Sequence, residues 1–382
     1  MHVVVAPDKF KGSLSAIDVA AHVAAGLTRA APDVTVAQVP VADGGDGTVA
    51  AALAAGFRRV PVRAGGPTGA PVDTAYAERD GVAVVELADA SGLGRLPGGR
   101  FEPRTASSYG TGEVLRAALD AGCRQIVLGI GGSASTDGGA GLVQALGARL
   151  YDRDGAELAR GGAALAGLDR MDLAALHPAV SATKITVASD VDNPLLGPHG
   201  AAVVYGPQKG ASPQDVAALD AALARWAAAV RVATGHDLAA RPGAGAAGGV
   251  GYAALALLGA GLRPGIDLVL ELVGLEQQLA GAQLVITGEG SLDEQTLRGK
   301  APAGVARAAH TAGVPVVCVA GRIRLTDEQV HSMGVRAAYA LTELEPDVQR
   351  CMSEAGPLLE RLAARIGHDW ARTAMQAERN DP

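Results

Sequence analysis

The hydrophobic pattern of this chain consists of short runs of apolar, often β-branched residues, each followed by a polar loop and then by a helical pattern. Such runs predict strands at residues 3–6 and 34–41 near the N-terminus, and at 284–287, 314–319 and 337–341 near the C-terminus. Strict alternation of strand and helix is typical of a parallel sheet. We therefore expect both ends of the chain to form parallel α/β structure.

The pattern changes at Arg58. Residues 59–62, 72–78 and 82–87 alternate between apolar and polar side chains, and the pair Asp80-Gly81 predicts a hairpin turn between the last two segments. Antiparallel segments of this kind interrupt the strand and helix alternation. The middle of the chain is therefore predicted to be an insertion.

These patterns together predict two α/β domains. One is a discontinuous domain formed by residues 1–59 and 283–382, and the other is an inserted domain of residues 60–282. The five strands predicted for the first domain are the number that a flavodoxin-like parallel sheet uses.

The most distinctive stretch is the predicted strand 126–130, which runs directly into a glycine-rich loop at 131–139. Glycines adopt positive φ and allow a ligand to approach backbone N–H groups, so the loop is predicted to contact an anionic group. Its candidate binding residues are Gly131, Gly132, Ser133, Ser135, Thr136 and Asp137. A second glycine-rich run, 243–251, is either a hinge or another ligand loop.

Polar residues also follow the other predicted strands. Two lysines precede a helix that Ser15 and Asp18 are spaced to cap, and a helix N-terminus offers free N–H groups to phosphate. Because parallel strands end at one edge of a sheet, these residues are expected to converge on one rim. They are Lys9, Lys11, Asp43, Asp46, Glu289, Asp293 and Arg322.

Composition restricts the possible partners. The chain has 382 residues, a net charge of -7 and three cysteines without metal-ligand spacing. The charge disfavours general nucleic-acid binding, and the cysteines favour a reduced, cytoplasmic protein. No segment approaches the roughly 20 apolar residues of a membrane helix, and no signal sequence is predicted. A small-molecule partner is expected.

Four motifs in this order resemble the glycerate kinase family of the bacterial type 1 kind. They are residues 6–15 (APDKFKGSLS), 43–48 (DGGDGT), 129–141 (GIGGSASTDGGAG) and 287–293 (TGEGSLD) with 299–302 (GKAP). The resemblance runs nearly from end to end. It implies ATP-dependent phosphorylation of D-glycerate to 2-phosphoglycerate, with 3-phosphoglycerate also open, in a cleft between the domains. It also implies a flavodoxin-like domain and an inserted domain resembling the restriction-endonuclease core.

Phosphoryl transfer needs positioning groups, cations and Mg²⁺ held by carboxylates. We predict that Lys9, Lys11 and Ser13 hold a phosphate or the glycerate carboxylate, and that Asp190, after the predicted strand 184–188, orients or deprotonates the hydroxyl. Asp43, Asp46, Asp293 and Glu289 compete for Mg²⁺. The predicted catalytic residues are Lys9, Lys11 and Asp190; the binding residues are Ser13, the loop residues above, Gly288, Glu289, Lys300 and Arg322; the metal ligands are Asp43, Asp46 and Asp293.

Two other classes of protein are open alternatives. Residues 129–134 (GIGGSA) match the dinucleotide-binding fingerprint, and Asp152 follows at the required spacing, so an NAD(P)-dependent oxidoreductase acting on a small hydroxy acid is one alternative. Against it, Gly138 and Gly139 would interrupt the first turn of the required helix. A non-catalytic solute-binding protein is the other alternative, and it normally needs export.

Overall fold

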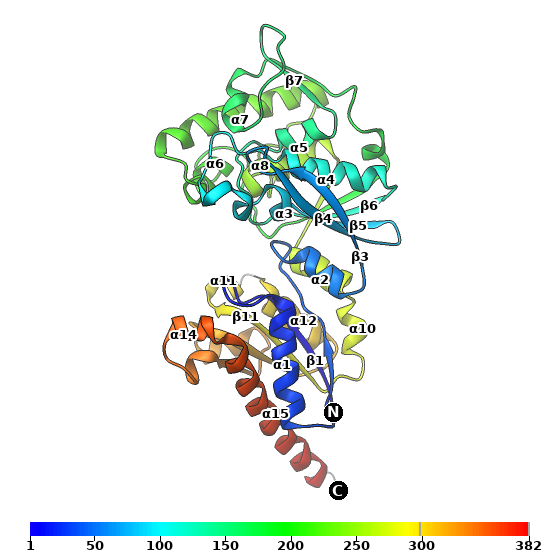
Figure 1. Cartoon of the computed structure of the whole chain (residues 1–382), viewed down its shortest axis with the longest axis vertical. Coiled ribbons are helices and arrows are strands. Elements are labelled where there is room, and N and C mark those ends of the chain that lie inside the picture. The colour runs from blue at the N-terminus through cyan, green and yellow to red at the C-terminus, as the bar shows by residue number, and fades with distance from the viewer. Residues whose placement is uncertain (298, 381–382) are drawn as a thin grey trace. The chain divides into compact units, whose positions relative to one another are not determined.

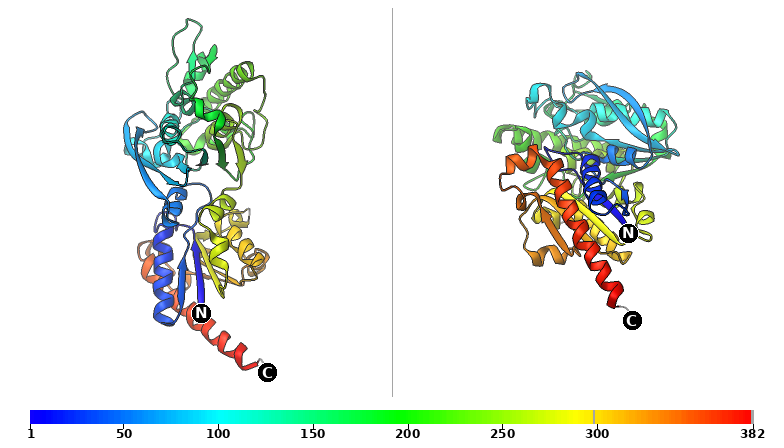
Figure 2. Two further views of the ribbon diagram at one scale, coloured as in Figure 1. Left: turned by 90° about the vertical axis from the view of Figure 1, so that its right-hand side faces the viewer. Right: turned by 60° about the horizontal axis from the view of Figure 1, so that its bottom comes forward.

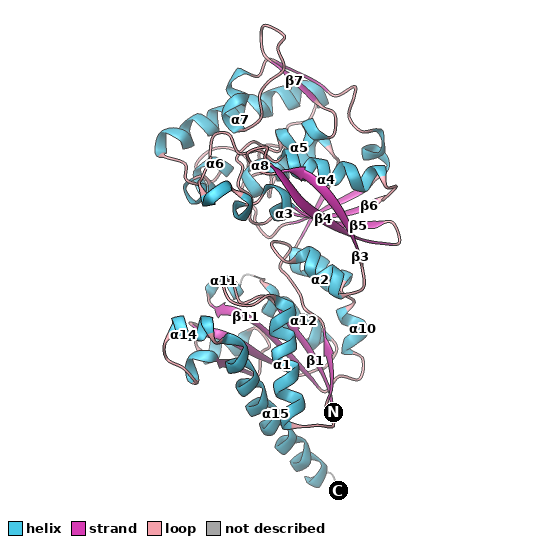
Figure 3. Cartoon of the chain, viewed as in Figure 1, coloured by secondary structure: helices cyan, strands magenta, loops and turns pink. Residues whose placement is uncertain are grey.

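The structure is a computed structural model that describes residues 1–297 and 299–380. The chain divides into two compact units (Figure 1). Unit 1 contains Met1–Asp43, Ala50–Ala55 and Ile266–Pro382, and unit 2 contains Gly44–Val49 and Gly56–Gly265. Both units mix helices with sheets that contain parallel strands, so the predicted α/β class is confirmed (Figure 3).

Unit 1 is built on a sheet of five parallel strands in the order β13-β12-β11-β1-β2. The strands are β1 (His2–Pro7), β2 (Thr35–Gln38), β11 (Leu284–Leu292), β12 (Val316–Ile323) and β13 (Ala337–Ala340). Val3 pairs with Leu284 and Ala6 pairs with Thr287, so strands from the two ends of the chain are neighbours in one sheet.

Helices cover both faces of this sheet because alternate side chains of each strand point to opposite faces. Val3 and Val5 pack with α1 (Ala16–Ala30), α14 (Val348–Ser353) and α15 (Ala355–Asn380). Val4 and Ala6 pack with α9 (Gly265–Leu272), α10 (Leu275–Leu279), α12 (Ala301–Thr311) and α13 (Asp327–Ser332). Among the described residues there are three further short helices: α2 (Thr48–Ala54), α11 (Glu294–Leu297) and η6 (Leu341–Glu343).

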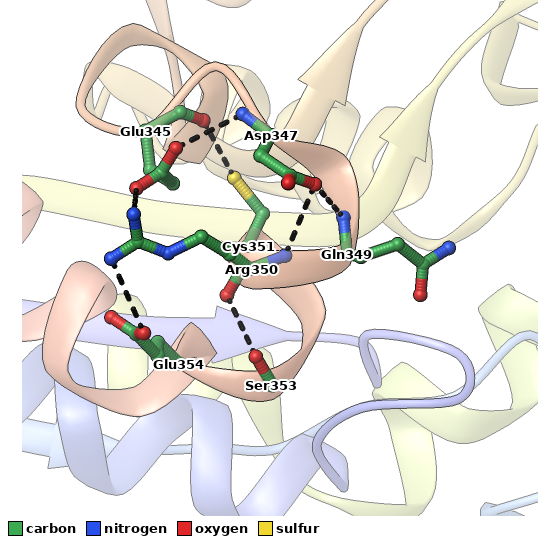
Figure 4. Close-up of polar contacts among 7 residues, drawn as sticks. All are labelled: Glu345, Asp347, Gln349, Arg350, Cys351, Ser353 and Glu354. Carbon is green, nitrogen blue, oxygen red and sulfur yellow. Dashed lines mark hydrogen bonds and ion pairs between the residues drawn. The ribbon is translucent and has the colours of Figure 1, made fainter.

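Helix α14 begins at a carboxylate cap (Figure 4). Asp347 accepts hydrogen bonds from two backbone N–H groups of the first turn. Arg350 forms ion pairs with Glu345 at 3.1 Å and Glu354 at 3.5 Å, and the Cys351 thiol donates to the carbonyl oxygen of Glu345. These contacts are local, and they hold α14 in place beside α15.

Unit 2 is built on a six-stranded mixed sheet in the order β10-β9-β6-β5-β4-β3. Strands β5, β6, β9 and β10 are parallel to their neighbours in this group, whereas β3 and β4 are antiparallel. The strands are β3 (Arg58–Gly65), β4 (Pro71–Arg79), β5 (Val82–Glu86), β6 (Gln125–Gly129), β9 (Lys184–Ala188) and β10 (Gly261–Arg263), with a separate hairpin of β7 (Arg149–Tyr151) and β8 (Arg170–Asp172).

One hydrophobic core unites the helices of unit 2 with its sheet. The helices are α3 (Leu87–Ser91), α4 (Tyr109–Asp120), α5 (Ala140–Ala145), α6 (Ala201–Tyr205), α7 (Pro213–Thr234) and α8 (Ala246–Leu257), with short turns η1 (Leu93–Arg95), η2 (Pro97–Gly99), η3 (Gly162–Gly167), η4 (Pro178–Ala182) and η5 (Pro207–Lys209). The predicted hairpin is confirmed, since Asp80 and Gly81 both have positive φ, at 53° and 79°. Among the described residues, no helix is long and apolar enough to cross a membrane.

The borders of the two units differ from the predicted domain borders. The chain returns to unit 1 at Ile266 rather than at residue 283, because α9 and α10 pack on its sheet through Ile266, Val269 and Leu275. In addition, residues 44–49 belong to unit 2, although the elements on either side of them belong to unit 1. The predicted borders rest on the pattern of strands along the sequence. That pattern does not indicate which helices pack on a given sheet.

Gly26 allows the close packing of α1 against α15, two helices that lie side by side (Figures 1 and 2). A Cβ atom at Gly26 would lie 2.3 Å from the carbonyl oxygen of Glu360 and 2.8 Å from the Cβ of Ala363. Helix propensity alone predicts that Gly26→Ala stabilises the protein by about 1 kcal/mol. We expect the opposite sign, because overpacking against backbone costs about 1–3 kcal/mol.

Urea unfolding measures this difference. Ala25→Gly, at an exposed position of the same helix, calibrates the propensity and is expected to cost about 1 kcal/mol. A Gly26→Ala variant more stable than the wild type would contradict the close packing.

Candidate active site

In unit 1, the ends of the parallel strands carry a cluster of charged residues. Asp8 follows β1 and is 7% exposed; its Oδ1 accepts the backbone N–H of Lys9 at 2.6 Å and lies 3.7 Å from the Lys9 Nζ. Burial raises the pKa of Asp8 to about 6, against the opposing charge of Lys9, and Asp43 raises it further. Sequence reasoning missed Asp8, although a carboxylate directly after a strand was the available signal.

Glu289 is the second buried carboxylate of this cluster. The hydroxyl of Thr296 donates to it at 2.5 Å. Burial raises its pKa to about 7, Thr296 and Lys300 act in the opposite direction, and Asp8 and Asp293 raise it. Lys9, Asp43 and Lys300 therefore act electrostatically on Asp8, and Lys300, Asp8 and Asp293 act on Glu289.

The strand predicted at 284–287 is longer in the structure. β11 continues to Leu292, and Gly288 and Glu289 pair with β12. Glycine is required here by strand packing, since a Cβ at Gly288 would lie 2.2 Å from the carbonyl oxygen of Val319. Packing therefore explains the glycine at this position, and a ligand contact of Gly288 stays a prediction.

The N-terminus of α12 lies next to the charged cluster. Lys300 is its N-cap residue and makes no side-chain cap hydrogen bond within the described residues, and Pro302 occupies the first turn. By contrast, α1 has the predicted capping box, in which the Ser15 hydroxyl accepts the N–H of Asp18 at 3.2 Å. An N-terminus without a side-chain cap is the better anion site of the two.

Three predicted residues of unit 1 are not among the groups that act on Asp8 and Glu289. The Ser13 hydroxyl donates to the carbonyl oxygen of Met352 at 2.6 Å, and the Nε of Arg322, in β12, donates to the Ser291 hydroxyl at 3.2 Å. Lys11 is exposed on the loop between β1 and α1.

In unit 2, residues 44–49 lie across the ends of the parallel strands. A Cβ at Gly129 would lie 2.7 Å from the carbonyl oxygen of Gly44, and one at Gly131 would lie 2.7 Å from the Cα of Gly45. A Cβ at Gly44 would lie 2.8 Å from the Cβ of Ala188, the last residue of β9. Two glycine-rich segments that are far apart in the sequence therefore meet here through backbone contacts.

Glu86, the last residue of β5, holds this segment. Its carboxylate accepts the N–H groups of Gly47 and Val49, each at 3.1 Å. Burial raises the pKa of Glu86 to about 8, Asp89 and Asp46 raise it as well, and the hydrogen bonds from Val49 and Gly47 act in the opposite direction. Sequence reasoning missed Glu86 because it looks like an ordinary strand residue.

The solvent-facing part of the glycine-rich loop is limited to its beginning. Gly131 and Gly132 are the residues with appreciable exposure, and Gly132 has a φ of 74°. The carbonyl oxygen of Gly132 accepts the N–H of Leu93 at 2.9 Å. Among the described residues, no hydrogen-bond acceptor is found for the N–H groups of Gly131, Gly132 and Ser133. These three N–H groups are suited to an anionic oxygen.

The rest of the loop, which includes the predicted binding residues Ser135, Thr136 and Asp137, is internal. All three are fully buried. Asp137 accepts hydrogen bonds from the N–H and hydroxyl of Ser108 at 2.8 and 2.9 Å, and it also accepts from the Ser107 hydroxyl and from the N–H groups of Gly139 and Gly141. A carboxylate with five donors joins α4 to α5.

The second glycine-rich run, 243–251, packs against this loop. The N–H of Gly138 donates to the carbonyl oxygen of Gly248 at 2.9 Å. Ala247, Gly248 and Gly249 have successive φ values of 54°, 69° and 92° inside α8. The run is therefore a packing element that completes the back of the loop, and neither of the two expected roles is needed to explain its glycines.

Asp190 lies just after β9, where the sequence pattern predicts it. Its side chain is exposed, and its Oδ1 accepts the N–H of Gly265 at 2.9 Å. The predicted metal ligands belong to different units, with Asp43 and Asp293 in unit 1 and Asp46 in unit 2. In the part of the chain that the structure describes, no group of three or more His, Cys, Asp or Glu side chains is arranged to hold a metal ion.

Comparison with known proteins identifies the class to which these sites belong. The profile of the glycerate kinase family matches residues 3–371, and the chain belongs to this family. A glycerate kinase of Halalkalibacterium halodurans is 43% identical over 369 residues, covering 95% of this chain and 97% of that protein. Glycerate 2-kinase of Escherichia coli is 44% identical over 347 residues, covering 89% and 90%. A crystal structure described as glycerate kinase 2 of Salmonella typhimurium matches with a TM-score of 0.84 and 41% identity, covering 99% of both chains.

The raised pKa of Glu86 predicts a pH-dependent stability. Because the folded protein holds this proton more tightly than the unfolded chain, the contribution is fully present below the ordinary pKa of 4.5 and is lost as pH rises through about 8. Each unit of pKa difference corresponds to about 1.4 kcal/mol. Glu86→Gln retains an acceptor oxygen and has no charge to gain. Urea unfolding at a series of pH values is expected to give a flatter profile for the variant, and parallel profiles would contradict the raised pKa.

Proposed function

We propose that this protein uses ATP to phosphorylate D-glycerate and that the product is 2-phosphoglycerate. The observation that supports this most strongly is similarity over nearly the whole chain to proteins named glycerate kinase and, at 44% identity, to one named glycerate 2-kinase. The strand ends of both units carry groups suited to anionic substrates. Membership of a kinase family implies ATP as the phosphoryl donor.

In unit 2, we propose that the N–H groups of Gly131, Gly132 and Ser133 bind an anionic oxygen of a substrate. A glycerate carboxylate and a nucleotide phosphate are both anions that such a loop accepts. The positive φ of Gly132 and the exposure of this short segment favour this role. Asp190, exposed after β9, is proposed to orient or deprotonate the attacking hydroxyl.

In unit 1, we propose that Lys9, Lys300 and the N-terminus of α12 neutralise phosphate oxygens. The neighbouring carboxylates suit Mg²⁺, which needs only one or two of them besides substrate phosphates and water. These carboxylates repel one another, since Asp43 raises the pKa of Asp8 and Asp8 raises the pKa of Glu289. Repulsion of this kind favours a bound cation. The cation would supply charge neutralisation on the transferred group.

We propose more limited roles for the remaining predicted site residues. Lys11 is proposed to contact a phosphate or the glycerate carboxylate from its exposed loop. Ser13 and Arg322, which contact Met352 and Ser291, are proposed as supports of the neighbouring segments. Asp46 is proposed as a charge next to Glu86 rather than as a member of the unit 1 cluster.

We also infer finer features of the fold and setting. The strand order of unit 1, with β1 between β2 and β11, supports a flavodoxin-like sheet. Unit 2 is proposed to resemble the restriction-endonuclease core, as the family resemblance implies. The net charge of -7 supports a small-molecule partner rather than nucleic acid, and the three buried free cysteines favour a cytoplasmic setting.

The oxidoreductase alternative has no support. The dinucleotide fingerprint requires a helix that starts within the glycines, whereas α5 begins only at Ala140, after left-handed Gly138 and Gly139. Its acidic residue should follow the next parallel strand. Asp152 instead follows β7, which belongs to an antiparallel hairpin in a separate sheet.

One assay tests the proposed function. The protein is incubated with ATP, Mg²⁺ and D-glycerate, ADP release is followed, and the phosphorus NMR spectrum of the product is recorded. We expect ADP release that depends on D-glycerate and a signal of 2-phosphoglycerate, with L-glycerate as the matched control substrate. Absence of D-glycerate-dependent ADP release would overturn the function, and a 3-phosphoglycerate signal would overturn the proposed position.

A further inference from the structure

Lys209 is a buried lysine whose partners all lie on one loop. It ends η5, between α6 and α7, and is 2% exposed. Its Nζ donates to the Ser133 hydroxyl at 2.7 Å and to the carbonyl oxygen of Ser135 at 2.5 Å. Among the described residues, no carboxylate lies within ion-pair distance of it. Burial lowers its pKa to about 7, and the charge of Asp137 acts in the opposite direction.

A buried ammonium group is unfavourable unless its hydrogen bonds and charge are compensated. An apolar side chain would serve the core of unit 2 better than Lys209 does. Two neighbouring hydroxyls, those of Ser135 and Thr136, are also buried and have no hydrogen-bond partner in the part of the chain that the structure describes. Such groups ordinarily require an explanation other than stability.

The ammonium group also determines how the Ser133 hydroxyl is oriented. An ammonium group only donates hydrogen bonds, so the Ser133 oxygen accepts and its own proton points away from Lys209. Ser133 directly follows Gly131 and Gly132, whose N–H groups we propose as anion donors. The opposite edge of the segment is held by the hydrogen bonds from Leu93 to Gly132 and from Ala134 to Ser91.

Little space is left around the lysine. A Cβ at Gly248 would lie 2.9 Å from the Lys209 Nζ and 2.1 Å from the carbonyl oxygen of Ser135. The left-handed turn of α8 therefore closes one side of the site, and Lys209 and Ser135 are held in fixed positions relative to each other. A shift of the lysine would be transmitted directly to the loop.

We propose that Lys209 is a positioning residue, which holds the loop 131–135 in its anion-binding conformation and orients the Ser133 hydroxyl toward the bound anion. The proposal rests on the proposed function of this loop. Lys209 itself is buried beneath the loop and acts through Ser133 and the backbone of Ser135.

The test compares four variants of the full-length protein. Lys209→Met keeps the length of the side chain without its donors, Ser133→Ala removes the oriented hydroxyl, and Gly132→Val obstructs the loop directly. Lys184→Met, at an exposed lysine of β9 in the same unit, is the control. For each protein we would measure kcat, KM and the thermal shifts produced separately by D-glycerate and by ATP with Mg²⁺.

We expect Lys209→Met to lower kcat/KM by about 100-fold, the scale for losing one preorganised donor. It should lose the thermal shift with the same ligand as Gly132→Val and retain the shift with the other ligand. Ser133→Ala should cost about tenfold alone and little more in the Lys209→Met background, because neighbouring groups that act together are not additive. Lys184→Met should behave as the wild type.

The outcomes distinguish two claims, that the loop binds an anion and that Lys209 positions the loop. If Gly132→Val loses a thermal shift but Lys209→Met keeps both shifts and stays within threefold of wild-type kcat/KM, the positioning role is wrong and the loop remains a binding site. If Gly132→Val keeps both shifts, the loop is not the binding site and both claims fail. If Lys209→Met does not fold, Ser133→Ala decides, and a kcat/KM within twofold of the wild type would overturn the proposal.

Discussion

The close approach of backbone segments at the ends of parallel strands is the constraint on which both candidate sites depend. In unit 2, Gly129 and Gly131 leave no room for a Cβ because the segment 44–49 lies directly on them. In unit 1, Gly288 and Gly321 are similarly limited by the carbonyl oxygens of Val319 and Gly290. Removing side chains at these points brings backbone N–H groups and carboxylates to the strand ends, where open α/β sheets bind ligands.

This packing also affects the pKa values of the carboxyl groups at the strand ends. Asp8 and Glu289 are held among other carboxylates and away from water, so their pKa values lie above the ordinary range. Lys9 and Lys300 oppose that effect only in part. Raised carboxyl pKa values of this kind are frequent at functional sites, which is why we propose a functional role for this cluster. Glu86 differs, because its carboxylate holds the backbone of residues 44–49.

Sequence patterns identified the strand ends, because apolar runs followed by glycine and carboxylates mark them directly. Lys9, Asp43 and Glu289 were predicted in this way, and the structure places them in the charged cluster of unit 1. The orientation of each loop residue depends on contacts with residues that are distant in the sequence. A local sequence pattern does not reveal such contacts. Asp137, for example, accepts a hydrogen bond from Ser108, 29 residues earlier in the chain, and nothing in residues 131–139 indicates that contact.

Other features were hidden for the same reason. Lys209 lies 76 residues from Ser133 along the chain, and Trp226 fills the space beside Gly138. The return of the chain to unit 1 at Ile266 depended on helices that pack on its sheet, not on strands. The sequence shows that 131–139 and 243–251 are rich in glycine. It does not show that these two segments pack against each other.

The central claim is that the N–H groups of Gly131, Gly132 and Ser133 bind an anionic group of a substrate. Hydrogen–deuterium exchange of peptides covering residues 129–135 tests it most directly, with and without saturating D-glycerate or ATP and Mg²⁺. These amides have no acceptor among the described residues, so bound substrate should slow their exchange. Unchanged exchange with both ligands, in a protein that still forms product, would contradict the account.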